Sequence, residues 1–195
     1  MDAHRRAVAD ELLVASREHD AAQTDRVARY RNLEPESAKL LAVLVKATAP
    51  GTIVELGTSN GYSTIWLADA AEAGGARLIS VEIDADRTEQ ARGNLERAGL
   101  SADLRTQDAG ELLRAADDGA WDFVFLDAER PAYAGYWPDL LRALAPGALL
   151  VIDNVISHAE QVEEVTALIE AEPTVTTALV PIGAGLRVVV KDGRQ

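Results

Sequence analysis

The stretch Val54–Thr64, "VELGTSNGYST", decides the fold, because a strand turns through glycines into a helix there. The apolar run that begins at Gly51 is typical of a buried strand, and "TIWLADAAEA" after the turn is typical of a helix. Gly57 and Gly61 lie at the turn, where many nucleotide-binding proteins place glycines. The question is which ligand this spacing of glycines serves.

The two familiar phosphate-binding fingerprints do not fit the turn. Counted from Gly57, the dinucleotide pattern G-x-G-x-x-G needs glycine where the chain has Ser59 and Tyr62. The P-loop pattern needs glycine and then lysine, where the chain has Tyr62 and Ser63. Neither a dinucleotide site of the usual kind nor a P-loop is therefore predicted.

What remains is an acid, Glu55, followed by glycines at 57 and 61. This pattern suits a ligand that has a cationic group for the acid and a carboxylate for the helix N-terminus, such as S-adenosylmethionine. The alternative is a turn whose glycines only make room for tight packing. Glu82 closes the next strand, where an acid commonly holds ribose hydroxyls. Asp108 follows the third strand and can reach an adenine or cap the next helix.

The order of the elements predicts a doubly wound α/β fold. From residue 51 onward strands and helices alternate five times, and several strands are apolar throughout, as in a parallel sheet covered on both faces. The last strands, "TVTTALVPI" and "GLRVVVKD", predict a hairpin that adds one antiparallel strand. Residues 3–31 favour one or two helices, and another helix begins near Pro35. We therefore expect one domain, 1–195, with a helical cap at 1–48 and an α/β core at 51–195.

Composition narrows the class of protein further. The 195-residue chain has no cysteine, which excludes disulfides, a thiolate nucleophile and a Cys-based zinc site and favours the cytoplasm. The net charge of −13 predicts repulsion from phosphate backbones, so no nucleic-acid partner is expected. No apolar run approaches the ~20 residues of a membrane span, and no signal peptide is recognised, so no membrane partner is expected.

Four segments, in this order and spacing, resemble the catechol O-methyltransferase-like family of S-adenosylmethionine-dependent enzymes: "VELGTSNGYST", "SVEID", "DFVFLDAERPAYAGYW" and "GALLVIDNV". The resemblance runs from about Leu33 to the end of the chain. It implies a Rossmann-like methyltransferase sheet, a small hydroxylated, catechol-like acceptor and often a homodimer. It also implies that Glu82 holds the ribose, that Asp108 lies near the adenine and that Asp127 belongs to the same site. The residues implied to line the methionine part are Glu55, Gly57, Ser59, Gly61 and Ser63.

Three oxygen-bearing side chains stand where two strands end. Asp127 ends the fourth strand, and Asp153 and Asn154 end the fifth. If these strands are neighbours, the three hard oxygen ligands suit Mg²⁺ or a similar ion. The alternative is that Asp and Asn are simply common at such turns. The resemblance favours the metal, because relatives bind a divalent cation through an Asp and then an Asp–Asn pair.

The chain departs from its relatives at Arg130. Relatives usually carry there the lysine proposed as general base, three residues after the first metal Asp, but an arginine with a pKa above ~12 cannot accept a proton. With Asp127, Arg130 is the catalytic candidate: it can stabilise the phenolate or pair with a carboxylate or phosphate on the substrate. The alternative is a surface ion pair with Glu129 or Asp139. His158 is a second candidate base.

Several functions therefore compete. A metal-dependent O-methyltransferase leads, and the alternatives are a metal-independent methyltransferase, a cofactor-binding protein without catalysis and, more remotely, a nicotinamide-linked oxidoreductase. The aromatic residues Tyr133, Tyr136 and Trp137 either wall an acceptor pocket or pack in the core. The N-terminal helices are expected to complete the acceptor pocket.

Overall fold

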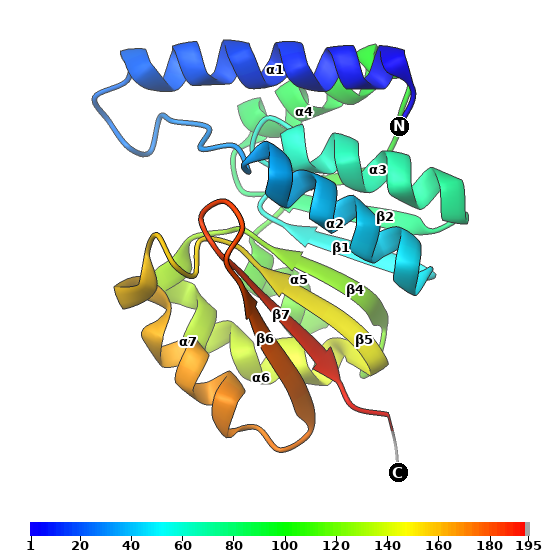
Figure 1. Ribbon diagram of the computed structural model, residues 1–195, viewed down its shortest axis with the longest axis vertical. Helices are drawn as coiled ribbons and strands as arrows, with labels where there is room; N and C mark the ends of the chain where they lie inside the picture. Colours follow the sequence, from blue (N-terminus) through cyan, green and yellow to red (C-terminus); the bar gives the residue numbers. More distant parts are fainter. Residues whose placement is uncertain (194–195) are drawn as a thin grey trace.

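The computed structural model describes residues 1–193, which form a seven-stranded sheet with helices on both faces (Figure 1). The strand order is β3-β2-β1-β4-β5-β7-β6, in which β7 runs antiparallel to both of its neighbours. This confirms the doubly wound sheet with one antiparallel hairpin strand. The strands are β1 (Thr52–Leu56), β2 (Arg77–Glu82), β3 (Asp103–Thr106), β4 (Trp121–Leu126), β5 (Leu144–Ile152), β6 (Val175–Val180) and β7 (Leu186–Lys191).

The helices form a layer on each face of the sheet. One layer contains α2 (Pro35–Thr48), α3 (Tyr62–Gly74) and α4 (Ala85–Arg97), with α1 (Ala3–Ala22) lying across α3 and α4 (Figure 1). The other contains α5 (Ala109–Ala115), α6 (Tyr133–Ala143) and α7 (Ala159–Ala171). A short 3₁₀ turn, η1 (Arg130–Ala132), precedes α6.

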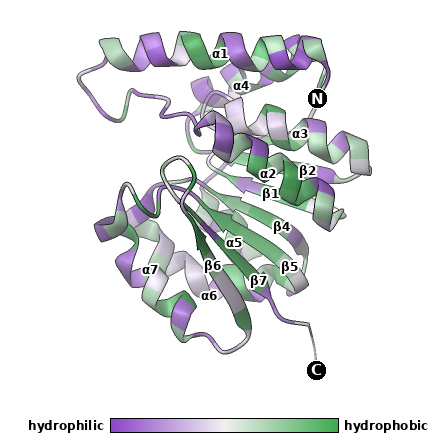
Figure 2. Ribbon diagram, viewed as in Figure 1, coloured by the Kyte–Doolittle hydropathy of each residue, from purple (hydrophilic) through white to green (hydrophobic). Residues whose placement is uncertain are grey.

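Two hydrophobic cores result from the alternation of side chains along the central strands. In β1, Ile53 packs toward α2 and α3, whereas Val54 and Leu56 pack toward α5 and α6. Because both faces are covered, β1 and β4 read as apolar runs rather than as an alternating pattern. Figure 2 shows the central strands as hydrophobic and the outer helices as mixed.

The segment before α2 differs from the expectation of helix up to residue 31. α1 ends at Ala22, and residues 23–34 form an extended loop, here called the lid loop. The Asp20 carboxylate accepts hydrogen bonds from the backbone N–H groups of Tyr30 (2.7 Å) and Arg31 (2.9 Å), which folds the loop back onto α1. The side chain of Asp20 thus satisfies two backbone N–H groups that a continued helix would have bonded to its own carbonyls.

The apolar stripe of α1 is covered within the chain. Val8, Leu12 and Leu13 are buried in the core that also contains α3. The need to cover this stripe therefore gives no support to a homodimer, which stays an untested prediction.

A second boundary also differs from expectation. The segment from Tyr133 to Pro146–Gly147 predicts a helix that stops at the Pro–Gly pair, but α6 ends at Ala143 and β5 begins at Leu144. Leu144 already pairs with Trp121 of β4, and a register shift follows before Phe123 pairs with Leu149. Strand pairing with β4 thus claims residues that the sequence pattern assigned to the helix.

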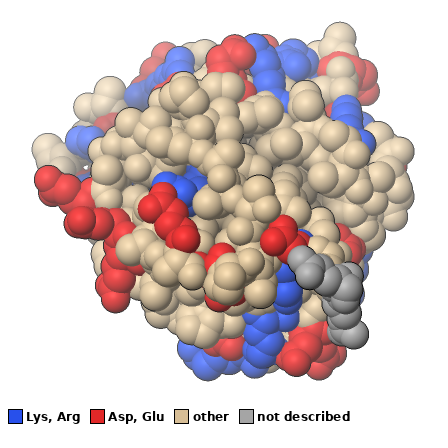
Figure 3. Space-filling model, turned by 60° about the horizontal axis from the view of Figure 1, so that its bottom comes forward, with Lys and Arg blue, Asp and Glu red and all other residues tan. Residues whose placement is uncertain are grey.

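The surface agrees with an acidic protein. On the face drawn in Figure 3, lysine and arginine occur in small separate groups rather than as a continuous band.

Across residues 1–193, no helix combines the length and the apolar character that crossing a membrane requires.

Candidate active site

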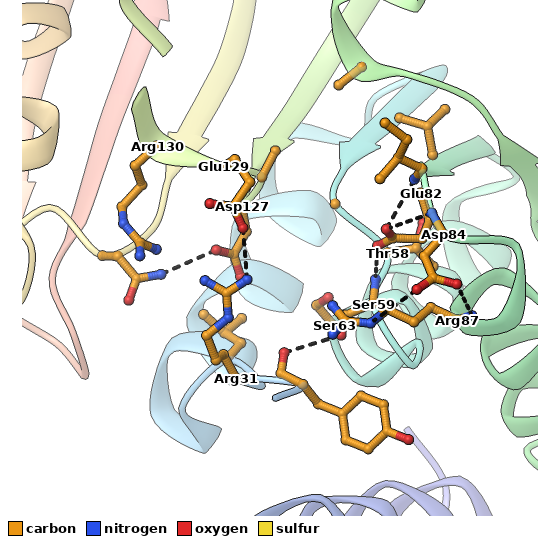
Figure 4. A pocket seen from close by; sticks show the side chains of 18 of the residues that line it. Arg31, Thr58, Ser59, Ser63, Glu82, Asp84, Arg87, Asp127, Glu129 and Arg130 are labelled. Atoms are coloured by element: carbon orange, nitrogen blue, oxygen red, sulfur yellow. Dashed lines mark hydrogen bonds and ion pairs between the residues drawn. The ribbon is translucent and has the colours of Figure 1, made fainter. Parts of the chain in front are cut away.

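A cavity of about 490 Å³ opens at the carboxyl edge of the sheet, where ligands of doubly wound folds bind. Its wall comes from the loops after β1, β2, β3, β4 and β5, and from the lid loop (Figure 4). The candidate site residues that line it are Gly57, Ser59, Ser63, Glu82, Asp108, Asp127, Arg130 and Asn154. The candidates that do not line it are Glu55, Gly61 and Asp153.

The Glu82 carboxylate is fixed by backbone donors at one end of the cavity. Its Oε2 accepts a hydrogen bond from Ser59 N (2.8 Å), and its Oε1 accepts from Ile83 N (3.0 Å) and Asp84 N (3.1 Å). A carboxylate has about four acceptor positions, so these three bonds leave capacity for a ligand hydroxyl. Glu82 is therefore positioned as an acceptor that faces the cavity.

Tight packing accounts for both glycines of the turn. At Gly57, which has φ 106°, an added Cβ would lie 2.2 Å from the carbonyl oxygen of Asp127. At Gly61, which has φ 89°, it would lie 3.0 Å from the Cα of Ala91 on α4. Close approach and positive φ both require glycine here. This packing is compatible with ligand binding, because Gly57 also lines the cavity.

Glu55 lies beneath the turn rather than in the cavity. It is fully buried, and its carboxylate accepts hydrogen bonds from Ser63 Oγ (2.5 Å), Thr64 Oγ1 (2.6 Å) and Ser80 Oγ (2.5 Å). Burial raises the pKa of Glu55 to about 7, and the three hydroxyl groups oppose the rise. Its contact with the site is indirect, because it holds Ser63, which lines the cavity.

Asp108 has both of the positions considered for it. Its carboxylate caps α5 by accepting a hydrogen bond from Glu111 N (2.9 Å), and its side chain also lines the cavity. Of the three aromatic candidates, only Tyr136 lines the cavity. Tyr133 is fully buried and donates to the carbonyl of Ala128 (3.0 Å), and Trp137 is buried in the core beneath α6.

The carboxyl ends of β4 and β5 bring Asp127, Asp153 and Asn154 together, because these strands are parallel neighbours. Asn154 Nδ2 donates to Asp127 Oδ1 (3.1 Å) and to Asp153 Oδ2 (2.8 Å). The other oxygen of Asp153, Oδ1, is buried without a hydrogen-bond partner in the described part of the chain.

Both acids of this cluster are held in an unfavourable environment for negative charge. Burial raises the pKa of Asp127 well above its usual range, the charge of Asp153 adds to the rise, and Arg31 opposes it. Burial raises the pKa of Asp153 to about 6. Within residues 1–193 no group of three or more His, Cys, Asp or Glu side chains could hold a metal ion, so the candidate set here is two carboxylates and an amide.

Arg130 is buried in the cavity wall, with 4% of its surface exposed. Its Nε donates to Gln161 Oε1 on α7 (2.8 Å). The proposed surface ion pair with Glu129 or Asp139 is wrong, because Glu129 pairs with Arg31 (2.9 Å) and Asp139 pairs with Arg142 (3.1 Å).

His158, the second candidate base, also lines the cavity. Its Nδ1 lies 2.8 Å from Ser157 Oγ, and its backbone N–H donates to the carbonyl of Asn154 (3.1 Å). His158 follows Asn154 closely in the sequence and lines the same cavity as Asp127 and Asn154.

The lid loop contributes residues that sequence reasoning missed. Tyr30, Arg31 and Asn32 line the cavity, and Arg31 forms an ion pair with Glu129, which lines the same cavity (Figure 4). Ser59 Oγ donates to the carbonyl of Tyr30 (3.1 Å), which ties the lid loop to the glycine turn. The available signal was the basic and aromatic segment "RVARYRN", which lacks a helical apolar pattern.

Arg87 of α4 is the second contributor that was missed. Its NH2 donates to the carbonyls of Val27 and Arg29, and its guanidinium lies over the ring of Tyr30, 5.9 Å from the centroid. Arg87 lines the cavity and holds the lid loop from α4.

Comparison with known proteins agrees with the fold. Residues 7–192 match the family described as O-methyltransferase. The chain is 38% identical over 138 residues to a catechol O-methyltransferase of Niastella koreensis, and 34% identical over 147 residues to a catechol O-methyltransferase of Mycobacterium tuberculosis. These matches cover 68% and 74% of this chain, but only 62% and 64% of the relatives.

A solved structure of an O-methyltransferase has a similar fold. The O-methyltransferase from Bacillus cereus, in complex with SAH, superposes with a TM-score of 0.79 at 27% identity and covers 95% of this chain and 91% of its own. Family match and sequence identity thus agree with the architecture. The chain belongs to the O-methyltransferase family.

Proposed function

We propose that this protein transfers a methyl group from S-adenosylmethionine to a hydroxyl of a small, catechol-like acceptor, with the help of Mg²⁺ or a similar ion. The observation that carries the proposal is the cavity itself, which has the fixed acceptor Glu82 on one side and the Asp127–Asp153–Asn154 cluster on another. The family match and the SAH-bound relative support the choice of cofactor.

The residues present fit this cofactor. Glu82 has hydrogen-bonding capacity left for ribose hydroxyls, and Asp108 lines the same cavity and would be available to the adenine. Ser63, in the first turn of α3, faces the cavity where the helix N-terminus favours a carboxylate. S-adenosylmethionine bound there would supply an electrophilic methyl carbon: its bond to sulfur would break as a bond to the acceptor oxygen formed, and the electron pair of the C–S bond would stay on sulfur.

The acid cluster fits a divalent cation. Asp153 has a buried oxygen without a partner, and burial raises the pKa values of both acids, so a cation between them would satisfy the oxygen and stabilise the charges. Asn154 would have to turn its amide oxygen toward the ion, and the two ends of an amide differ little in shape. A divalent cation bound there would make an acceptor hydroxyl that ligates it more acidic.

The remaining residues of the site position the acceptor. Arg130 cannot remove a proton, so we assign the proton of the attacking hydroxyl to water. Arg31, whose charge acts on Asp127, would place positive charge beside the acid cluster at which a phenolate would form. The lid loop lines the cavity on the side of Tyr30, where it would limit the access of water to a bound acceptor.

An assay of methyl transfer from labelled S-adenosylmethionine to a panel of catechols, with Mg²⁺ and with excess chelator, tests this proposal. We expect transfer that requires the metal. Equal transfer in chelator would favour a metal-independent methyltransferase. Cofactor binding without transfer to any acceptor would favour a binding protein. Binding of a nicotinamide dinucleotide in place of S-adenosylmethionine would favour an oxidoreductase.

Location, type of partner and oligomeric state are also part of the proposal. The absence of cysteine supports a cytoplasmic location. The net charge of −13 supports a small-molecule partner over a nucleic acid. A homodimer is proposed from the family resemblance, and light scattering on the purified chain tests it.

A further inference from the structure

Arg130 is a buried cation without an acidic partner. Only 4% of its surface is exposed, and among the described residues its side chain makes one hydrogen bond, between Nε and the neutral Gln161. Within residues 1–193, no carboxylate oxygen lies within 4.0 Å of its nitrogens. Burying an unpaired charge is costly, and arginine does not lose its proton to escape that cost. Such a group calls for a counter-charge that arrives with a ligand.

The second arginine of the cavity has a different role. Arg31 pairs with Glu129 (2.9 Å), and its charge opposes the rise in the pKa of Asp127. Figure 4 shows Arg31 beside Asp127 and Glu129, with Arg130 on the other side of this pair. The positive charge of Arg31 is therefore already matched by acids of the chain, whereas that of Arg130 is not.

The contact with Gln161 also decides which edge of Arg130 is free. A guanidinium can hold a carboxylate along the edge that includes Nε or along the edge of its two terminal nitrogens. Nε is occupied by Gln161 Oε1 at 2.8 Å, which leaves the two terminal nitrogens for a ligand in the cavity. The arrangement suits a planar, singly charged carboxylate, since a more highly charged anion would meet stronger repulsion from Asp127 and Glu129 in the same wall.

We propose that Arg130 is a specificity residue that binds a carboxylate on the methyl acceptor, so that the preferred acceptors are hydroxylated aromatic acids. This rests on the proposed function, because it names the substrate class of the same site. Gln161 is then a positioning residue, which acts on the acceptor through Arg130.

The test measures binding without turnover. S-adenosylhomocysteine replaces S-adenosylmethionine, Mg²⁺ is present, and calorimetry compares 3,4-dihydroxybenzoate with 3,4-dihydroxybenzamide, which has the same shape and no charge. We expect the native protein to bind the acid roughly tenfold or more tightly than the amide, the range of a charge-assisted bond. Arg130→Gln should remove this preference by weakening the acid alone, and Arg130→Lys should retain part of it.

Two further variants keep the test decisive. Arg92→Gln removes an exposed arginine of α4, 45% of whose side chain is exposed, and should leave both affinities unchanged. Gln161→Leu frees Nε without removing the charge, and should reduce the preference by a smaller factor than Arg130→Gln. If Arg130→Gln fails to fold, as judged by its melting curve, Arg130→Lys and Gln161→Leu still report the preference.

The outcomes separate the two proposals. Equal binding of acid and amide by the native protein, with both compounds methylated in the assay, would overturn the role of Arg130 and leave the proposed function standing. A preference for the acid that survives in Arg130→Gln would also overturn it, as would an undiminished preference in both Arg130→Lys and Gln161→Leu. If neither compound bound or were methylated, both proposals would fall.

Discussion

The backbone N–H of Ser59 donates a hydrogen bond of 2.8 Å to the carboxylate of Glu82. Ser59 follows β1 and Glu82 ends β2, so this bond fixes the glycine turn to the neighbouring strand. Ser59 has φ 49°, a conformation that its own side chain does not favour. The same carboxylate thus shapes the turn and faces the cavity, which links the conformation of the turn to any ligand that Glu82 holds.

Replacing Glu82 should weaken cofactor binding. Glu82→Ala removes the acceptor proposed for the ribose and also releases Ser59 N, so we expect the affinity for S-adenosylhomocysteine to fall by roughly 1–3 kcal/mol. Calorimetry measures this loss. Glu89→Ala removes a like charge from the exposed face of α4 and should change nothing. Native affinity in Glu82→Ala would show that the cofactor does not use this carboxylate.

Replacing Asp153 should abolish metal binding and spare the cofactor. Asp153→Asn keeps the size of the side chain but removes one of the two carboxylates, so we expect Mg²⁺ titration to show no heat and methyl transfer to be lost. Affinity for S-adenosylhomocysteine should stay within about twofold, because Asp153 does not line the cavity. Asp117→Asn, at an exposed position, is the matched control. Methyl transfer by Asp153→Asn at the native rate would mean that the cluster has only a structural role.

Strand ends explain why much of this site was readable from the sequence. Each parallel strand places its last residue at one edge, so Glu82, Asp127 and Asn154 could be assigned to a common cavity from their positions alone. The position of Glu55 could not be read in this way. Glu55 follows Val54 and therefore points to the opposite face of β1, between the sheet and α3, where it meets Thr64 and Ser80.

The lid loop marks the limit of prediction for a physical reason. Its conformation depends on contacts between residues far apart in the sequence, such as Arg87 with Arg29 and Ser59 with Tyr30. Local sequence patterns predict helices and strands, because the hydrogen bonds of these elements are local or regular. They do not predict individual contacts between side chains and distant backbone groups. A surface ion pair was one alternative for Arg130 because its contact with Gln161 of α7 also joins residues far apart in the sequence.

The buried acid Glu55 should make stability depend on pH. Its pKa rises from 4.5 in the unfolded chain to about 7 in the folded protein, so the folded state holds a proton that the unfolded state has lost between these values. Stability must then fall as pH rises from about 4.5 to about 7, by roughly 3 kcal/mol in total.

Glu55→Gln tests this dependence because it keeps the size of the side chain and cannot ionise. Urea unfolding at a series of pH values gives the free energy of unfolding for both proteins. We expect the difference between the two curves to change across this window in favour of the variant as pH rises. A constant difference would show that Glu55 has the same pKa in the folded and unfolded states. Gln90→Glu, on the exposed side of α4, controls for a change of charge alone.

Loss of Arg87 should release the lid loop. Its guanidinium donates to the carbonyls of Val27 and Arg29 and lies over Tyr30, so Arg87→Ala removes these three contacts between α4 and the loop. Amide hydrogen exchange at residues 27–33 should become faster by about tenfold, as expected when roughly 1.4 kcal/mol of local stability is lost.

The rest of the lid loop supplies the comparison. Asp20 holds Tyr30 N and Arg31 N from the side of α1, so exchange at these two amides should rise less than at their neighbours. Arg92→Ala, which removes an exposed arginine from the same helix, should leave the exchange pattern unchanged. Because the loop covers the cavity, Arg87→Ala should also bind S-adenosylhomocysteine more weakly, mainly through faster dissociation. Unchanged exchange in Arg87→Ala would assign the closed loop to Asp20, to the Ser59–Tyr30 contact and to the Arg31–Glu129 ion pair instead.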